Sequence, residues 1–287
     1  MALALTSSSE VAARIAGARA VAFGSYVVPP AMCGALIAAA RRGAYVTVTL
    51  EAAPYDDPDG DLARRNAATA RSLRDAGAQV RLLGRDEPAF HLKAAVCDGV
   101  AYLDDRNWRT QGDTIVRDDD GEDVSLVRAA LEGRGGGDDT LATRKDLALA
   151  REAALIDAAR GVPVVVATES FGAGTISAAL LRHAAAGAPT TLFVAPHGAN
   201  RAFLARLARA GVTVRTANAN EKFALAGDAV WLGSANATYA GGAFGDQTDW
   251  GLVARDPALV AAIRARLDAY GAAGAGGVAC GAPSSRR

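Results

Sequence analysis

Short apolar runs alternate with longer amphipathic segments along most of the chain. The runs have the length and composition of buried strands, and the segments between them are typical of helices. The expected strands are 20–23, 46–50, 162–167, 190–195 and 212–216, and the expected helices are 32–40, 62–75, 141–159, 176–186 and 201–210. This alternation predicts an α/β fold with parallel or mixed sheets that are flanked by helices.

The pattern occurs twice, because three blocks of the first half recur in the second half. The matching blocks are 21–43 with 165–187, 76–81 with 210–215, and 93–107 with 222–236. We therefore expect a first repeat at 1–132, a linker and connecting helix at 133–160, a second repeat at 161–271 and a flexible tail at 272–287. Two like halves are expected to pack as a pseudo-dimer within a monomeric chain.

The third repeated block carries the polar residues with the clearest chemistry. They are His91, Lys93 and Asn107 in the first copy, and Lys222, Ser234 and Asn236 in the second. Side chains two residues apart on a strand point the same way, so His91 and Lys93 are expected to face one site. A phosphodiester needs its charged oxygens neutralised while a nucleophile attacks in line, and an imidazole beside lysines and amides supplies both functions.

The pattern H-x-K-x-x-x-x-D, followed by G-S-x-N, resembles the phospholipase D superfamily, in which two such motifs meet at one active site. The resemblance implies that His91 is a nucleophile that forms a phosphohistidine intermediate, with no metal and no cofactor. It also implies that Asp123 and Asp249, which open the similar segments DVSLV and DWGLV, orient the histidine. The substrate would be a phosphodiester, with phospholipid ranked above nucleic acid.

The second motif departs from that pattern. Asn220 stands where the second histidine is expected, Gly227 replaces its aspartate, and Asp104–Asp105 replaces Gly-Ser in the first copy. An amide cannot transfer protons as an imidazole does, so Asn220 would only contact substrate. Either activity is lost, or another group acts as general acid: Glu169, which follows an expected strand, or His197, in the loop after the next one.

Structural roles are the alternative for both candidate acids. Glu169 also fits a carboxylate at a helix start, which the helix dipole favours, and His197 also fits an ordinary loop residue. If neither serves as the acid, the chain would be an inactive module that binds a phosphate ligand. A nuclease acting on nucleic-acid phosphodiesters is a further alternative.

Charge and composition narrow these alternatives. The 287 residues include 31 Lys and Arg and 31 Asp and Glu, so the formal net charge is zero. This balance counts against a main function in sequence-independent binding of nucleic acid, though a local basic cleft stays compatible with it. The sequence lacks a secretion signal and any apolar run of about 18 residues, so we expect a cytoplasmic protein with at most peripheral membrane contact.

Overall fold

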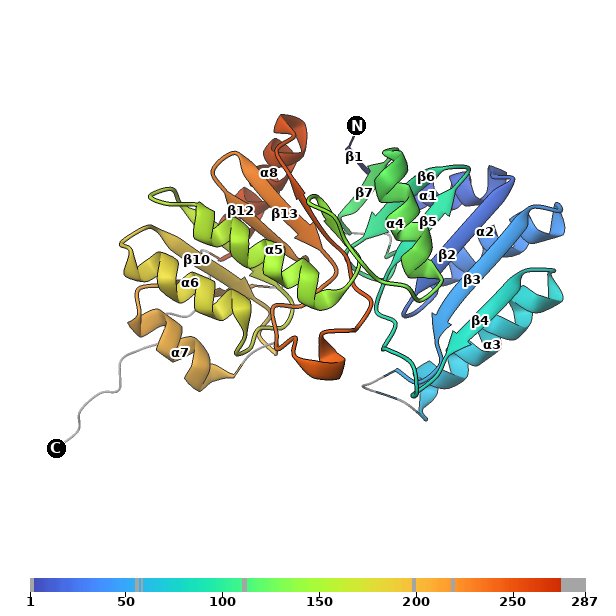
Figure 1. Ribbon diagram of the computed structural model, residues 1–287, viewed down its shortest axis with the longest axis horizontal. Coiled ribbons are helices and arrows are strands. Elements are labelled where there is room, and N and C mark those ends of the chain that lie inside the picture. Colours follow the sequence, from blue (N-terminus) through green and yellow to red (C-terminus); the bar gives the residue numbers. More distant parts are fainter. Residues whose placement is uncertain are drawn as a thin grey trace.

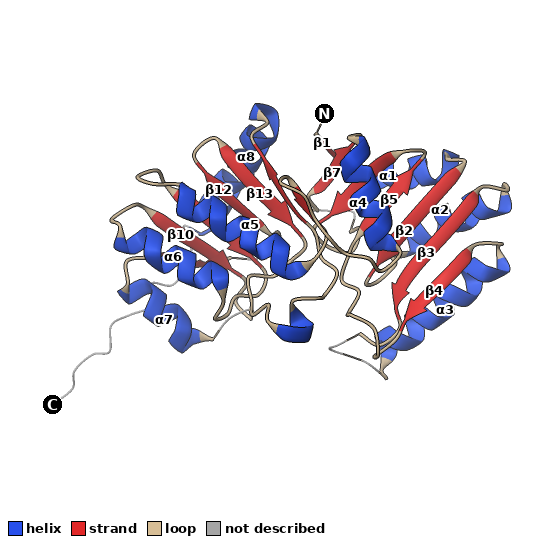
Figure 2. Ribbon diagram, viewed as in Figure 1, coloured by secondary structure: helices blue, strands red, loops and turns tan. Residues whose placement is uncertain are grey.

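The computed structural model describes residues 3–54, 57, 59–109, 113–197, 200–217 and 220–274. Within them the chain forms two lobes, each built on a seven-stranded sheet with helices on both faces (Figures 1 and 2). The predicted tail at 272–287 falls mostly outside the described residues, and its first residues belong to the last helix. No helix in the described ranges has the length and apolar character needed to cross a membrane.

The two lobes contain the same strands and α-helices in the same order, and the second has one additional short 3-10 helix. The first has β1 (Ala4–Thr6), α1 (Ser8–Gly17), β2 (Ala20–Ser25), α2 (Pro30–Arg41), β3 (Tyr45–Glu51), α3 (Asp61–Asp75), β4 (Gln79–Leu83), β5 (Ala94–Cys97), β6 (Val100–Asp104), β7 (Ile115–Asp118) and α4 (Gly121–Leu131). The second has β8 (Leu141–Ala142), α5 (Lys145–Ala158), β9 (Val164–Thr168), α6 (Thr175–Ala185), β10 (Thr190–Val194), α7 (Arg201–Arg209), β11 (Thr213–Thr216), β12 (Phe223–Ala226), β13 (Ala229–Gly233), the short 3-10 helix η1 (Gly242–Phe244), β14 (Gly251–Ala254) and α8 (Pro257–Gly274).

Strand order confirms the duplication. The sheets run β1-β7-β6-β5-β2-β3-β4 and β8-β14-β13-β12-β9-β10-β11, which are the same order. In each sheet three strands are parallel and the others are antiparallel, so the predicted mixed sheets in two repeated halves are confirmed. The helices and strands expected from periodicity lie within a few residues of their observed bounds, and glycines in the left-handed region follow α2, α3, α6 and α7.

One predicted helix is wrong at its start. Residues 141–142 form strand β8, which pairs with β14, and helix α5 begins only at Lys145. Because α5 packs on β12, β13 and β14, this connecting segment is already part of the second lobe. The expected domain boundaries themselves stay predictions.

The lobes share an apolar core. A single cluster of buried residues contains Leu103 and Val116 from the first lobe together with Phe223 and Trp250 from the second. Backbone hydrogen bonds also cross the boundary, since Thr248 N donates to Ala89 O and His91 N donates to Thr248 O, each over 3.0 Å. This two-way pairing fixes the segment before β5 against the segment before β14, and the candidate site lies there.

Candidate active site between the two repeats

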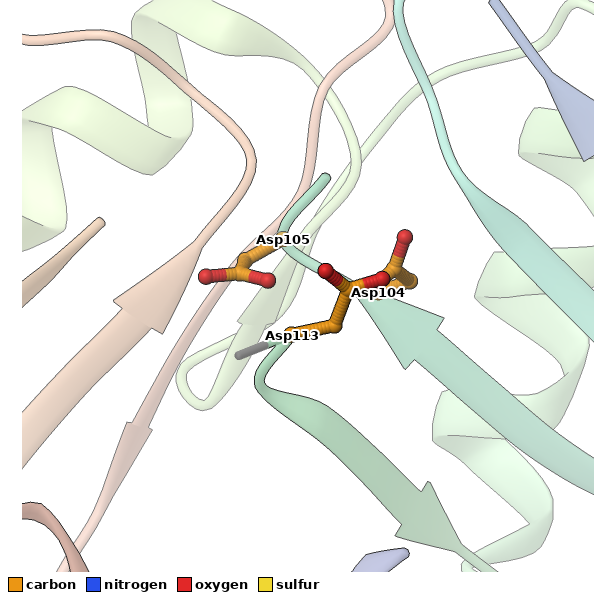
Figure 3. Close-up of side chains that lie close together, drawn as sticks. All are labelled: Asp104, Asp105 and Asp113. Carbon is orange, nitrogen blue, oxygen red and sulfur yellow. The ribbon is translucent and has the colours of Figure 1, made fainter. Parts of the chain in front are cut away.

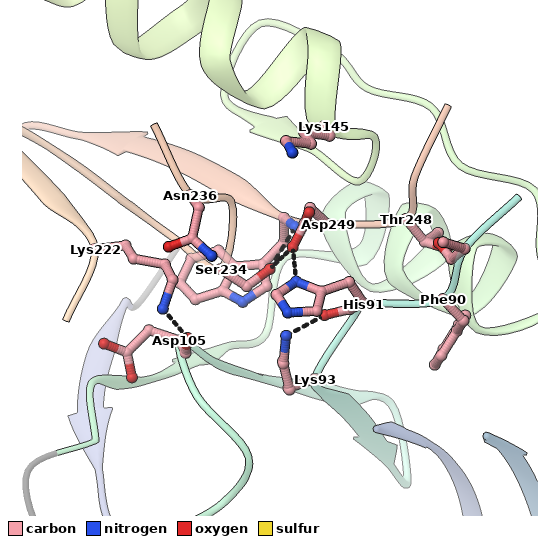
Figure 4. A network of polar contacts seen from close by, with 12 residues as sticks. Phe90, His91, Lys93, Asp105, Lys145, Lys222, Ser234, Asn236, Thr248 and Asp249 are labelled. Atoms are coloured by element: carbon pink, nitrogen blue, oxygen red, sulfur yellow. Dashed lines mark hydrogen bonds and ion pairs between the residues drawn. The ribbon is translucent and has the colours of Figure 1, made fainter. Parts of the chain in front are cut away.

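His91 and Asp249 come from different repeats and meet at this crossing. Pairing of the backbone at Phe90 and Thr248 places the two following side chains next to each other, and His91 Nδ1 lies 2.7 Å from Asp249 Oδ1 (Figure 4). The Ser234 hydroxyl donates to the same carboxylate oxygen, also over 2.7 Å. A buried serine and a buried histidine therefore hold one carboxylate in place.

This contact sets the chemistry of the imidazole. With Nδ1–H donated to the carboxylate, Nε2 carries the lone pair. Burial, and then the charge of Lys93, lowers the pKa of His91 below 6.5, which keeps the ring neutral at physiological pH. Burial alone would raise the pKa of Asp249, but His91, Lys93 and Ser234 hold it below its usual value. The pair is thus a neutral imidazole on an ionised carboxylate, the form that a nucleophilic histidine needs.

Two buried lysines lie beside the ring in matching conformations. Lys93 Nζ donates to the carbonyl of His91 over 2.5 Å, and Lys222 Nζ donates to the carbonyl of Asn220 over 3.1 Å. Their exposed fractions are only 1% and 3%. Burial, opposed by Asp249 and reinforced by Lys222, lowers the pKa of Lys93 to about 7. Buried ammonium groups of this kind gain stability when an anion binds between them.

The lysines line a small polar pocket of about 50 Å³. Its wall consists of His91, Lys93, Asp105, Arg106, Asn107, Arg109, Glu169, Asn220 and Lys222. Six of the predicted site residues are therefore brought together around one concave surface. The sequence pattern did not single out Arg106 and Arg109, although they lie one residue before and two residues after Asn107 and could have been found from that proximity.

The remaining predicted residues divide between the site and its surroundings. Asn236 lines a neighbouring cavity that also reaches His91, and its Oδ1 accepts a hydrogen bond from Ser170 N over 3.2 Å. Glu169 Oε2 lies 3.2 Å from Lys222 Nζ. His197, by contrast, is exposed in the turn after β10 and belongs to neither wall. Of the two candidate acids, only Glu169 reaches the pocket.

The predicted alignment of Asp123 with Asp249 is wrong. Residues 123–127 lie in helix α4, whereas the segment after Asp249 leads into strand β14. Asp123 is buried next to Asp118, and burial together with that neighbour raises the pKa of Asp123 to about 8. It lines neither wall around His91, so the structure gives it no part in orienting the histidine.

Strand register identifies Asp113 as the true counterpart of Asp249. The pairing of β6 with β7 matches that of β13 with β14, and each aspartate lies two residues before the second strand of its pair. The Asp113 carboxylate contacts Arg106 Nε at 3.0 Å. The second half-site therefore has Asn220 where the first has His91, and its carboxylate pairs with Arg106 instead of a histidine.

Three carboxylates gather in this second half-site. Oxygens of Asp104, Asp105 and Asp113 all lie within 4.8 Å of one another (Figure 3). Burial raises the pKa of Asp104 well above its usual range, with the charges of Asp105 and Asp113 adding to the effect. The pKa of Asp105 rises to about 7 for the same first reason. The cluster therefore holds protons at neutral pH. Two of its members, Asp104 and Asp105, occupy the positions at which the other repeat has Gly-Ser.

The first lobe has a different residue at the position that is equivalent to Glu169. Glu169 directly follows β9, and Tyr26 directly follows the equivalent strand β2. The Tyr26 ring lies 5.3 Å from the His91 ring, edge to face, and 5.8 Å from Lys93 Nζ. A carboxylate on one side and an aromatic ring on the other make the two halves of the pocket chemically unequal.

Two solved structures share this fold over nearly the whole chain. Polyphosphate kinase from Porphyromonas gingivalis matches with a TM-score of 0.68 and 16% identity, over 93% of this chain and 46% of that one. Phosphatidylserine synthase from Haemophilus influenzae Rd KW20 matches with a TM-score of 0.67 and 11% identity, over 93% of this chain and 85% of that one. No family model and no curated protein sequence matches.

Both neighbours belong to the phospholipase D superfamily, and this chain has the two-lobed fold of that superfamily. It spans less than half of the polyphosphate kinase chain.

Proposed function

We propose that the protein is a phosphodiesterase or phosphatidyl-type transferase that works through a phosphohistidine on His91. The observation that supports this most directly is the hydrogen bond between His91 and Asp249, because each repeat supplies one member of the pair. The two buried lysines beside the ring add the positive charge that a phosphodiester requires.

In the first step, the Nε2 lone pair of His91 attacks phosphorus as the bond from phosphorus to the leaving oxygen breaks. The leaving oxygen keeps that electron pair and takes a proton from the general acid. Lys93 and Lys222 neutralise the non-bridging oxygens, and the amides of Asn107 and Asn236 orient the group. The phosphorylated imidazolium that results is stabilised by the Asp249 carboxylate.

In the second step, water or an alcohol attacks the same phosphorus. The bond from phosphorus to Nε2 breaks, its electron pair returns to the imidazole, and the proton of the attacking hydroxyl passes to a base. Water gives hydrolysis, and an alcohol gives transfer. We keep phospholipid ahead of nucleic acid as the substrate class.

Glu169 is our candidate for the acid and base in these steps. Burial would raise its pKa, but Lys222, Lys93 and His91 lower it below the usual value in the ligand-free protein. A bound phosphodiester brings its own negative charge to Lys222, which weakens this effect and raises the pKa of Glu169. Glu169 can therefore take up a proton as substrate binds, and it can give that proton to the leaving oxygen.

Turnover of bis(p-nitrophenyl) phosphate tests this function. We expect wild-type protein to release nitrophenolate, His91→Ala to lose the activity, and His197→Ala, a histidine change outside the pocket, to keep it. Activity that persists in His91→Ala would refute the proposal. Vesicles of phosphatidylcholine and single-stranded DNA at low salt, tested in parallel, separate a lipid enzyme from a nuclease.

A non-catalytic phosphate-binding module is the second candidate, and the contact between Arg106 and Asp113 favours it. That contact uses the orienting carboxylate of the second half-site for a structural ion pair. A protein that turns over none of these substrates, but loses affinity for diethyl phosphate in Lys93→Met and Lys222→Met, would be such a module.

A further inference from the structure

A second, larger cavity opens next to the polar pocket, and His91 lines both. Its volume is about 400 Å³, within the usual range for small-molecule sites. The wall consists of Ala89, His91, Lys145, Ser170, Asn236, Thr238, Tyr239, Phe244, Gln247 and Asp249. Tyr239 and Phe244 are 63% and 65% exposed, which is unusual for aromatic side chains of a folded protein. The cavity thus combines apolar walls with direct access to the candidate nucleophile.

Lys145 is the one lysine in this wall, and it is buried. It is the first residue of α5, is 6% exposed, and donates from Nζ to the hydroxyl of Thr238 over 3.1 Å. Figure 4 shows it across Asp249 from Lys93, so it approaches His91 from the other side. Its ammonium is therefore separate from the pair of lysines in the polar pocket.

The charge of Lys145 is not matched by a carboxylate. Among the described residues, no acidic side chain lies within 4.0 Å of its Nζ. The Asp249 carboxylate, whose charge acts on Lys145, already binds His91 and Ser234 through Oδ1. A buried cation next to a cavity, with a neutral hydroxyl as its hydrogen-bond partner, would be stabilised by an anion bound there.

The duplicated motif does not account for Lys145. The equivalent helix in the first lobe is α1, and its first residues are serines, Ser8 and Ser9. The shared phosphate chemistry of the two repeats therefore has no need of a lysine at this position. Lys145 is a feature of the second lobe alone. A residue that selects a particular substrate would be expected in one lobe alone in the same way.

We propose that the larger cavity binds the organic substituent of the phosphodiester, and that Lys145 binds a second anionic group, a carboxylate or a phosphate, on that substituent. This inference rests on the proposed function, because it places the reacting phosphorus at His91, where the two pockets meet. Tyr239 and Phe244 contact the apolar stem that joins the phosphodiester to the second anion. The substrate class is thus a phosphodiester with a short apolar arm that ends in a negative charge.

Calorimetric titration with three dialkyl phosphates tests this subsite, with alcohol release followed in parallel so that the heat of turnover is separated from the heat of binding. The probes are propyl methyl phosphate, its analogue with a terminal carboxylate on the propyl arm, and its analogue with a terminal phosphate. We expect wild-type protein to bind the two charged probes at least about tenfold more tightly than the uncharged one. Comparison of the two charged probes tells carboxylate from phosphate as the preferred group.

Variants locate the effect at Lys145. Lys145→Met keeps the length and apolar stem of the side chain, so we expect it to fold, to bind propyl methyl phosphate normally, and to lose the tenfold preference. Arg144→Met removes one positive charge at the neighbouring position, where the side chain pairs with Asp146 outside the cavity. We expect it to keep the preference, and thermal unfolding checks both folds.

The outcomes separate this inference from the proposed function. No preference for charged probes in wild-type protein, or an equal loss of preference in both variants, overturns the subsite even if bis(p-nitrophenyl) phosphate is hydrolysed. A preference that depends on Lys145, in a protein that hydrolyses nothing, supports the subsite and contradicts the enzymatic function.

Discussion

Anion binding in the polar pocket should weaken steeply as pH rises, because the protonation of Lys93 controls it. Its pKa of about 7, lowered by burial, means that the ligand-free side chain loses its charge near neutral pH. An anion bound to the ammonium raises that pKa, so binding takes up a proton above about pH 7. Affinity should then fall by up to tenfold for each further pH unit, or about 100-fold at about pH 9, which equals about 2.7 kcal/mol.

The assay is titration with diethyl phosphate, which keeps one negative charge throughout this pH range. Asp105 lines the same pocket, and its pKa of about 7 would also weaken anion binding as the carboxylate ionises. Two variants separate the causes. Lys93→Arg keeps its charge at high pH and should flatten the profile, while Asp105→Asn should leave most of the slope in place. A slope that survives in Lys93→Arg and disappears in Asp105→Asn would refute the reasoning.

Three further outcomes follow from the structure. Glu169→Gln should keep turnover of nitrophenyl esters, because their leaving group needs no proton. It should slow turnover of alkyl esters by about 100-fold or more, measured as the rate of product release. Asp249→Asn should lower kcat for both ester types by about 100-fold or more, since the imidazolium loses its ionised partner; an unchanged kcat would exclude that role. Glu152 is buried in α5, and burial raises its pKa from 4.5 to about 8, so the folded state holds a proton that the unfolded chain releases. Wild-type stability should therefore fall between about pH 4.5 and about pH 8 by up to ~5 kcal/mol from this group, and Glu152→Gln should lack that decline in chemical denaturation at each pH.

Much of the fold was predictable because its elements are regular. Helices α2, α3, α6 and α7 end near glycines, and the parallel strands are short apolar runs, so local pattern was enough. Strand β8 was not predictable in this way. Its two residues, Leu141 and Ala142, suit a helix equally well, and only pairing with β14 makes them a strand. The alternation of apolar residues at 123–127 likewise resembles a strand, but Asp120 caps helix α4 there, accepting from the amides of Glu122 and Asp123.

The site was predictable to the extent that it repeats. His91, Lys93, Lys222 and Asn107 lie around one pocket, and the two lysines occupy equivalent positions directly before β5 and β12. The identity of Asp113 as the counterpart of Asp249 depends on strand register, which sequence similarity alone misassigned. A contact that occurs in one half alone is not repeated along the sequence, so a comparison of the two halves could not reveal it.

Those unrepeated contacts decide how far the two half-sites differ. Arg106 pairs with Asp113, and Glu169 approaches Lys222, through side chains that only the tertiary structure brings together. Lys145 is a similar case, because nothing in the order of residues around it indicates a cavity. The sequence therefore predicted the residues that the two halves share, while the asymmetry between the halves required the structure.

Transfer of the phosphoryl group to His91 can be detected by mass spectrometry of protein quenched during turnover of bis(p-nitrophenyl) phosphate. We expect an acid-labile adduct with the mass of the nitrophenyl phosphoryl group on the peptide that contains His91. The adduct should be absent from His91→Ala and present in His197→Ala. Turnover with no adduct on His91, or with the adduct on another residue, would contradict the role of His91 as the nucleophile.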